Sequence, residues 1–186
     1  MNISATILAA GSSERMEEAN KLLLPYRSEA LIKIVSKMLI DSLLDPIFIV
    51  TGYEHDKVVK LLPKSLDNII YNKDWHKGMS RSIYKAISSL PANIDGNMIV
   101  LGDMPLIKVE TINKLRSAFL NNNGEKIIYA EYFGKQANPV IFPKKYFKEM
   151  LLLKGDNGCK DIISQNRKNT LGVSVDSSEV IFDCDT

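Results

Sequence analysis

Short apolar runs and longer amphipathic stretches alternate along the first half of the chain. An apolar run bounded by turn residues is typical of a buried strand, whereas apolar residues at helical spacing indicate a helix. The pattern predicts strands at Ile3–Ala9, Ile47–Val50, Asn68–Tyr71 and Met98–Leu101. It predicts helices between them at Glu29–Leu44, His55–Leu62 and Ser80–Leu90. This alternation favours an α/β fold with a mostly parallel central sheet and helices on both faces.

The second half has a different pattern. Further helices are expected at Val109–Leu120, Lys144–Leu153 and Cys159–Gln165. Strands are expected at Ile127–Tyr132 and Pro139–Phe142, joined by a turn at Gly134, with a last strand that contains Val173 and Val175. Two strands joined by a turn run antiparallel, so this half is expected to add an antiparallel strand to the sheet. The length of 186 residues suits a single domain, residues 1–186.

Composition excludes several classes of protein. The chain is 45% hydrophobic and 25% charged, which is enough for a full core and an ordinary polar surface. A net charge of +2 gives no case for a nucleic-acid or membrane partner. No segment approaches the length of about 20 apolar residues that crosses a bilayer, and no signal peptide is visible, so a cytoplasmic location is expected. Cys159 and Cys184 do not have the spacing of a disulfide framework or a zinc site.

The Leu8–Lys21 segment, LAAGSSERMEEANK, holds the first candidate chemistry. It follows the first predicted strand, and Gly11, Ser12 and Ser13 leave its backbone accessible to a bound group. Arg15 and Lys21 add two cations, so the loop is suited to a nucleotide phosphate. It matches neither the GxxxxGK(S/T) phosphate loop nor the GxGxxG dinucleotide pattern. The alternative is an ordinary Gly-Ser turn.

Two more polar groups follow predicted strands. Asp103 ends the run that begins at Met98, at the sheet edge where α/β proteins bind ligands. A carboxylate there suits Mg²⁺, which prefers hard oxygen ligands together with substrate phosphates. The alternative is that Asp103 only caps the turn before Pro105. In the segment 72–82, Ser80 is expected to be the N-cap of the following helix, and the positive charge around Gly78 makes that helix start favourable for an anion.

These motifs together carry a family resemblance. Gly11-x-x-x-Arg15-Met16, followed by Lys21 and Leu22-Leu23-Leu24-Pro25, resembles the signature of the small nucleotidyltransferases of the MobA-like and MocA-like family. Leu101-x-Asp103-x-Pro105 resembles the family's metal-binding strand end, and Asn72-x-x-Trp75-x-x-Gly78-Met79-Ser80-x-Ser82 resembles the base-pocket segment of the MocA-like branch. The resemblance extends over nearly the whole chain. It implies a three-layer, Rossmann-like nucleotidyltransferase fold.

The resemblance also assigns roles to individual residues. It implies catalytic roles for Arg15, Lys21 and Asp103, and a Mg²⁺ site made by Asp103 and Asp185. The residues expected to bind the nucleotide are Leu8, Ala9, Ala10, Gly11, Ser12, Ser13, Arg15, Lys21, Gly78, Ser80 and Ser82. Two downstream matches are less complete. Ala137 stands where the family usually has glycine, and the turn Gly155-Asp156-x-Gly158 is equally well explained as a helix C-cap followed by a new N-cap.

The chemistry implied is transfer of CMP from CTP to a phosphate-bearing acceptor, with release of pyrophosphate. Ala9-Ala10-Gly11 looks like the cytidine-using variant of the family, which makes molybdopterin the expected acceptor and a molybdenum hydroxylase a further partner. Three alternatives remain open. One is a nucleotidyltransferase with a sugar-phosphate or isoprenoid-precursor acceptor, another is an enzyme that uses GTP, and the third is a non-catalytic protein that handles the cofactor.

Overall fold

A seven-stranded sheet forms the centre of the molecule. The computed structural model describes residues 1–12, 20–156 and 158–182. The strands lie in the order β5-β4-β1-β6-β8-β7-β9. Strand β1 (Ile3–Ala9) lies between β4 (Ile47–Thr51) and β6 (Gly96–Leu101) and is parallel to both, and β5 (Asn68–Tyr71) extends the parallel part beyond β4. The carboxyl ends of these four strands therefore lie at one edge of the sheet.

The C-terminal half adds three strands to the other side of β6. Strand β8 (Lys135–Pro143) is antiparallel to both β6 and β7 (Ile127–Tyr132), and β9 (Thr170–Ser174) is parallel to β7. The expected antiparallel strand in this half is thus confirmed. Pairing shifts at Tyr129 and Ala130, which face Val140 and Ala137, so Asn138 and Pro139 lie where the ladder is irregular. Proline has no N–H to donate to the ladder. Inside a sheet it is therefore tolerated at an irregular position of this kind.

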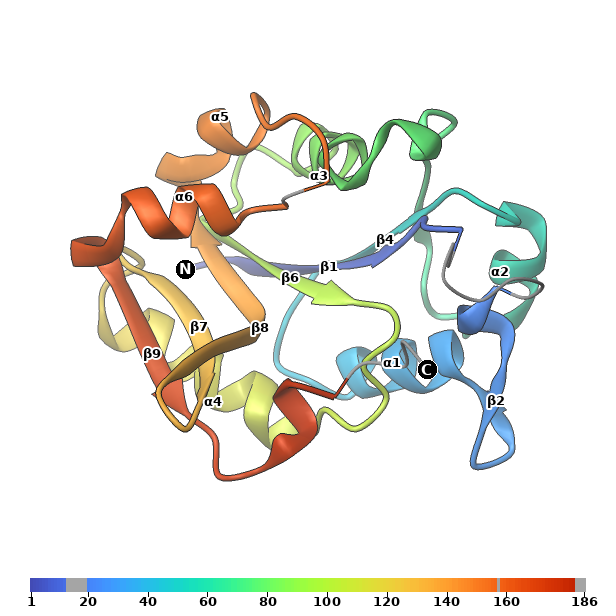
Figure 1. Ribbon diagram of the computed structural model, residues 1–186, viewed down its shortest axis with the longest axis horizontal. Helices are drawn as coiled ribbons and strands as arrows, with labels where there is room; N and C mark the ends of the chain where they lie inside the picture. Colours follow the sequence, from blue (N-terminus) through green and yellow to red (C-terminus); the bar gives the residue numbers. More distant parts are fainter. Residues whose placement is uncertain (13–19, 157, 183–186) are drawn as a thin grey trace.

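Helices cover both faces of the sheet (Figure 1). On one face lie α1 (Leu31–Ile40) and α4 (Val109–Asn121), and on the other lie α3 (Met79–Ser88), α5 (Phe147–Met150) and α6 (Lys160–Gln165). Helix α2 (His55–Leu61) lies near the β4–β5 end of the sheet. Among the described residues, two large apolar clusters fill the space between the layers, one around Phe119 and one around Phe142, and a small third cluster contains Ala10, Val50 and Ala86. The α/β class and the mostly parallel sheet are confirmed.

Short elements connect these layers. Strands β2 (Pro25–Tyr26) and β3 (Glu29–Ala30) form a hairpin outside the main sheet. Single 3₁₀ turns are formed by η1 (Lys21–Leu23), η2 (Trp75–Lys77), η3 (Lys144–Tyr146), η4 (Arg167–Asn169) and η5 (Ser178–Val180). In the part of the chain that the structure describes, no helix is long and apolar enough to cross a membrane.

Several predicted boundaries were wrong for physical reasons. The helix expected from Glu29 begins only at Leu31, because Arg27 and Ser28 take positive φ values and turn the chain into the β2–β3 hairpin. The helix expected at Lys144–Leu153 is a 3₁₀ turn followed by the short α5. The last strand ends at Ser174, although the N–H of Val175 still donates to the carbonyl of Glu131.

Candidate active site

A cleft of about 450 Å³ opens at the carboxyl ends of β1 and β6. The chain passes from β1 outward to β4 and β5 and then returns to the other side of β1 as β6, so the sheet changes direction between β1 and β6. Ligands of open α/β sheets bind at such a switch point. The walls of the cleft are formed by Leu8, Ala9, Ala10, Gly11, Ser12, Lys21, Leu22, Trp75, His76, Gly78, Met79, Ser82, Leu101, Gly102, Asp103 and Asp156.

The turn after β1 presents backbone to the cleft. A Cβ added at Gly11 would meet no atom of the described residues within 4 Å, so this part of the chain leaves space beside Gly11. Ala10 is fixed from behind, because its carbonyl accepts a hydrogen bond from the Tyr53 N–H at 3.0 Å. Gly52 allows this close approach, since a Cβ there would lie 2.7 Å from the Ala10 oxygen and 2.6 Å from the Trp75 Cβ. The strand end is therefore rigid while its ligand side stays open.

Lys21 and Asp103 form an ion pair inside the cleft. The Lys21 Nζ lies 2.6 Å from the Asp103 Oδ2, and the two side chains are only 15% and 13% exposed. The other carboxylate oxygen, Oδ1 of Asp103, is buried and has no hydrogen-bond partner among the described residues. A buried acceptor without a partner is costly, so this oxygen is suited to a cation or a hydrogen-bond donor supplied by a ligand.

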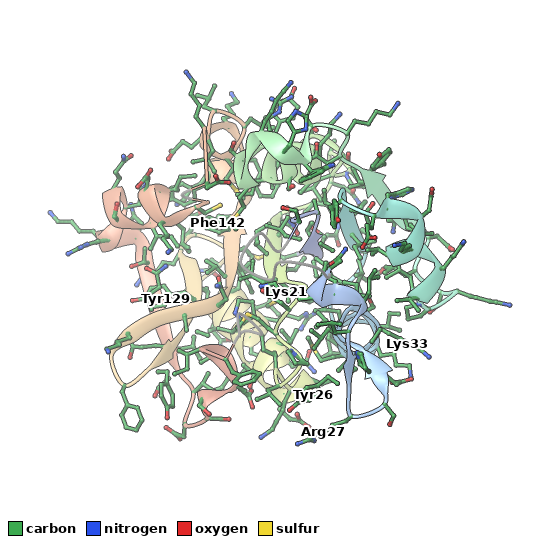
Figure 2. The ribbon with its side chains drawn as sticks, turned by 45° about the vertical axis from the view of Figure 1, so that its right-hand side comes forward. Lys21, Tyr26, Arg27, Lys33, Tyr129 and Phe142 are labelled. Atoms are coloured by element: carbon green, nitrogen blue, oxygen red, sulfur yellow. The ribbon has the colours of Figure 1, made fainter. Side chains whose placement is uncertain are left out.

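Local packing holds both members of the pair in place. Lys21 begins η1, and the Oδ1 of Asn20 accepts the Leu22 N–H at 3.1 Å at the start of that turn. Asp103 follows β6 in a loop that Met104 anchors in the core. In Figure 2 Lys21 lies near the centre of the molecule, whereas Arg27 and Lys33 lie toward its periphery. Among the described residues, no backbone N–H donates a hydrogen bond to the Asp103 side chain. Its alternative role as a turn cap is therefore not supported.

The start of α3 forms a third wall, and here the sequence-based prediction was wrong. Gly78, with φ of +97°, precedes the helix, and Ser80 lies inside its first turn, so Ser80 is not the N-cap. The first turn is instead satisfied by the loop after α5. The Asp156 Oδ1 accepts the Met79 N–H at 2.8 Å, and the Gly155 carbonyl accepts the Ser80 N–H at 3.0 Å.

That loop excludes any side chain at position 78. A Cβ added to Gly78 would lie 2.6 Å from the Asp156 Oδ1 and 2.9 Å from the Gly155 oxygen. Gly155 and Asp156, which the sequence could explain as part of a helix C-cap and a new N-cap, therefore cap a helix far away in the chain. The same loop also brings Asp156 to the cleft.

Aromatic and charged side chains border this wall. Trp75 packs edge-on against Tyr53, with ring centroids 5.3 Å apart, and it also lines the cleft. Beside it, the hydrogen bond from Lys77 lowers the pKa of Asp74 below its ordinary value, with smaller help from nearby Arg81. The expected concentration of positive charge is thus partly offset by Asp74.

The structure brings most of the predicted site residues together. Those that line the cleft are Leu8, Ala9, Ala10, Gly11, Ser12, Lys21, Gly78, Ser82 and Asp103. Ser80 is buried and is not among the lining residues. Ser13, Arg15 and Asp185 lie outside the described residues. Other residues that line the cleft were not among the predicted nucleotide-binding residues, although all of them lie in or beside the recognised motifs: Leu22, Trp75, His76, Met79, Leu101, Gly102 and Asp156.

Within the described part of the chain, Cys159 is not suited to act as a nucleophile, and no cluster of side chains forms a metal site by itself. Burial raises the pKa of the Cys159 thiol to about 12, so it stays protonated at neutral pH. No group of three or more histidine, cysteine, aspartate or glutamate side chains is placed to hold a metal ion within residues 1–12, 20–156 and 158–182. Asp103 is therefore the predicted metal ligand that the structure places at the cleft, while Asp185 lies outside the described residues.

A second cavity, of about 430 Å³, lies beside the start of α4. Its walls are formed by Tyr26, Arg27, Ile34, Pro105, Leu106, Ile107, Lys108, Ser177, Ser178 and Glu179. Glu179 is buried, accepts a hydrogen bond from the Thr111 hydroxyl and lies 3.4 Å from the Lys108 Nζ. These contacts hold η5 against α4.

Comparison with known proteins places the chain in a family. Residues 5–170 match the model of the MobA-like NTP transferase domain. The chain belongs to this family. Among curated relatives, the purine catabolism protein PucB of Bacillus subtilis is 27% identical over 169 residues, which is 86% of this chain and 80% of that protein. The recognition made from the sequence motifs is thus confirmed.

Solved structures share the fold. Rv0371c from Mycobacterium tuberculosis superposes with a TM-score of 0.89 at 22% identity, covering 100% of this chain and 93% of that one. The same protein has been solved in complex with manganese, with a TM-score of 0.81 at 21% identity over 95% and 90% of the two chains. A 4-diphosphocytidyl-2C-methyl-D-erythritol synthase from Anaerococcus prevotii superposes with a TM-score of 0.77 at 16% identity over 100% and 91%.

Proposed function

We propose that this chain transfers CMP from CTP to a phosphate group of an anionic acceptor and releases pyrophosphate, with molybdopterin as the acceptor. The observation that carries the proposal is the cleft at the ends of β1 and β6. It combines an open glycine turn, a largely buried lysine and a carboxylate oxygen that has no partner. A triphosphate needs these three features, namely space beside the backbone, a positive charge and a site for a cation.

Lys21 is the residue proposed to bind the departing phosphates. Its ammonium group carries three donors, so it can contact a phosphate oxygen while it remains close to the Asp103 Oδ2. The low exposure of the pair strengthens the attraction between Lys21 and phosphate, because little water screens it. The role expected for Arg15 in the same step stays a prediction.

The residues of the cleft fit a divalent cation held jointly with the substrate. Mg²⁺ commonly takes one or two carboxylates and completes its coordination with phosphate oxygens and water. The partnerless Oδ1 of Asp103 is an oxygen of the required kind. When bound, such an ion would neutralise phosphate charge. The manganese complex of Rv0371c, a protein of the same fold, agrees with the use of a divalent metal, and the choice of Mg²⁺ and a contribution from Asp185 remain proposals.

The reaction needs no general base. The acceptor phosphate is largely dianionic at neutral pH, because the second pKa of a phosphate monoester is about 6. One of its oxygens attacks the α-phosphorus of CTP and forms a new P–O bond. The bond between the α-phosphorus and the bridging oxygen to the β-phosphate breaks, and pyrophosphate leaves with the electron pair. Lys21 stabilises the negative charge that builds up on pyrophosphate, so the protein contributes position and charge.

The preference for cytidine rests on the turn after β1. Ala9 and Ala10 stand where the cytidine-using branch of the family is expected to have alanines, and Ala10 lies against Gly52 and Trp75 at the cleft wall. The fold neighbour from Anaerococcus prevotii, named as a synthase of a diphosphocytidyl compound, shows that this fold is compatible with a cytidine nucleotide. Molybdopterin as acceptor, and contact with a molybdenum hydroxylase, follow from the family resemblance.

The proposal is tested by a matrix of CTP, GTP and ATP against molybdopterin with Mg²⁺, read as pyrophosphate release. CTP with molybdopterin should give the highest rate. A higher rate with GTP would show that the two alanines do not select cytidine. If turnover occurs only with a sugar phosphate or an isoprenoid precursor, that compound is the acceptor and molybdopterin is not. Binding of CTP without pyrophosphate release would indicate the non-catalytic alternative.

A further inference from the structure

A buried asparagine lies directly behind the wall of the cleft. Asn72 follows β5, is fully buried, and its backbone N–H donates to the carbonyl of Thr51 at 2.8 Å. Its side chain makes two hydrogen bonds. The Oδ1 accepts the backbone N–H of Asp74 at 3.1 Å, and the Nδ2 donates to the Oγ of Ser82 at 3.0 Å. Ser82 is also buried, and it lines the cleft, whereas Asn72 does not.

The direction of these hydrogen bonds follows from one backbone group. A peptide N–H can only donate, so the side-chain atom of Asn72 that faces Asp74 must be the oxygen. The amide nitrogen then faces Ser82, and because it also can only donate, the Ser82 oxygen must accept. The hydroxyl proton of Ser82 is left for another acceptor.

Comparison with a second buried serine shows that the hydroxyl proton of Ser82 is unusual. Ser36, in the middle of α1, donates its hydroxyl proton to the carbonyl of Ile32 one turn earlier, at 2.7 Å. This is the common arrangement for a serine inside a helix. Ser82 lies in the first turn of α3, and within the described residues its hydroxyl proton has no acceptor.

We propose that Asn72 is a positioning residue that holds Ser82 as a hydrogen-bond donor toward the cleft, so that Ser82 reads an acceptor atom of the nucleobase. This inference rests on the proposed function. In cytosine the acceptor atoms are O2 and N3, and the exocyclic amino group is a donor that Ser82 does not read. Asn72 thereby sets the polarity of the base pocket without touching the base.

Reversing the polarity of residue 72 is the direct test. In Asn72→Asp the ionised carboxylate accepts the Ser82 proton, and Ser82 can no longer donate to the base. We expect the Kd for CTP, measured by calorimetry with Mg²⁺, to rise about tenfold, because one hydrogen bond is lost. Ser82→Ala should cause a similar rise, and the double variant should bind no more weakly than Ser82→Ala. The proposal would be overturned if the two increases in Kd multiply in the double variant, or if Asn72→Asp leaves the Kd for CTP unchanged.

The chain offers a matched control. Asn97 in β6 is equally buried and hydrogen-bonds to the hydroxyls of Ser4 and Thr6. Asn97→Asp should reduce stability and leave the Kd for CTP unchanged. An equal loss of affinity in Asn97→Asp would mean that a buried charge alone weakens binding, and would also overturn the proposal.

A second measurement does not depend on the folding of Asn72→Asp. CTP analogues that lack the N3 acceptor (3-deaza) or weaken the O2 acceptor (2-thio) are titrated into the wild type and Ser82→Ala. One analogue should bind the wild type about fivefold more weakly than CTP, and this difference should vanish in Ser82→Ala. If neither analogue binds differently from CTP, the inference fails while the proposed function stands. If the wild type binds no nucleoside triphosphate at all, both fail.

Discussion

The cleft at the strand ends and the second cavity beside α4 have nearly the same volume, about 450 and 430 Å³, but their walls differ. The cleft is lined by the ends of β1 and β6, by η1 and η2 and by the start of α3, and seven of its sixteen lining residues are glycine, alanine or serine. The second cavity is lined mainly by larger side chains from the β2–β3 hairpin, α1 and the loop before α4. Volume alone therefore does not distinguish a candidate active site.

The positions of the charged groups account for the difference. In the cleft Lys21 and Asp103 are largely buried, and one carboxylate oxygen has no partner. In the second cavity Glu179 is also buried, and its Oε2 likewise has no hydrogen-bond partner among the described residues, but Thr111 of α4 donates to its other oxygen and the nearby Lys108 is 65% exposed. The difference lies in the lysines: Lys21 is shielded from solvent and so is preorganised for an anionic ligand, whereas the charge of the exposed Lys108 is screened by solvent. Variants in the two cavities should accordingly have very different effects.

The largest effect is expected at Asp103. Asp103→Asn removes the negative charge proposed to hold the cation and should lower kcat by a factor of about 100 or more, with little change in fold. Pyrophosphate release at saturating CTP and Mg²⁺ measures it. Ser178→Ala, in the second cavity, is the matched control and should stay within about twofold of the wild type. An Asp103→Asn enzyme with half of the normal rate would refute the role of this carboxylate.

The next effect concerns Lys21. Lys21→Met should lower kcat about 30-fold, because pyrophosphate leaves without a nearby positive charge. Lys33, which is paired with Glu29 on α1, provides the control, and Lys33→Met should be neutral for kcat. In the double variant Lys21→Met with Asp103→Asn, the loss should be smaller than the product of the two single losses, because the residues contact each other. A full product of the two effects would show that they act separately.

A third effect should appear in stability. Gly78→Ala combines an unfavourable φ with a collision against Asp156, and is expected to cost about 2 kcal/mol. The melting temperature should fall by about 4–8 °C, and the KM for CTP should rise. Gly134→Ala is the control, because Gly134 also has a positive φ, but a Cβ there would meet nothing within 4 Å. Equal losses in the two variants would mean that the contact with Asp156 is unimportant.

Asp156 should have a smaller effect than Gly78. Asp156→Ala removes the acceptor for the Met79 N–H and should cost about 1 kcal/mol, as for other helix caps. Thermal unfolding should show a decrease of about 2–4 °C. Asp156→Asn keeps an acceptor oxygen and should lose less. If both variants melt like the wild type, the loop does not stabilise the start of α3.

The smallest effect is expected from Asp74 and depends on pH. Lys77 lowers the pKa of Asp74 in the folded protein, so the unfolded chain binds a proton more readily. The pair therefore stabilises the fold above the unfolded pKa, and this contribution is lost as pH falls through the lower folded pKa. Urea unfolding of the wild type and Asp74→Asn should differ slightly at neutral pH and converge in acid, and added salt should reduce the difference. A difference that does not change with pH would contradict this account.

Local patterns were sufficient for most of the fold. The strands at Ile127–Tyr132 and Asn68–Tyr71 have the predicted bounds, because apolar runs between turn residues determine where a strand begins and ends. Errors occurred where a neighbour in space replaced the local signal. Ser80 looked like an N-cap, but the N-cap residue is Gly78. The acceptor for the Met79 N–H comes from Asp156, in another part of the chain.

The sequence by itself determined the family, the alternation of strands and helices, and the ends of β1 and β6 as the place for a ligand. These follow from residues close together in the chain, whose periodicity and spacing act locally. Only the tertiary structure decided that Lys21 pairs with Asp103, that Asp156 caps α3 and that Asn72 donates to Ser82. Each of these contacts depends on how helices and loops pack over the sheet, and packing sets which polar atoms meet and which remain for a ligand.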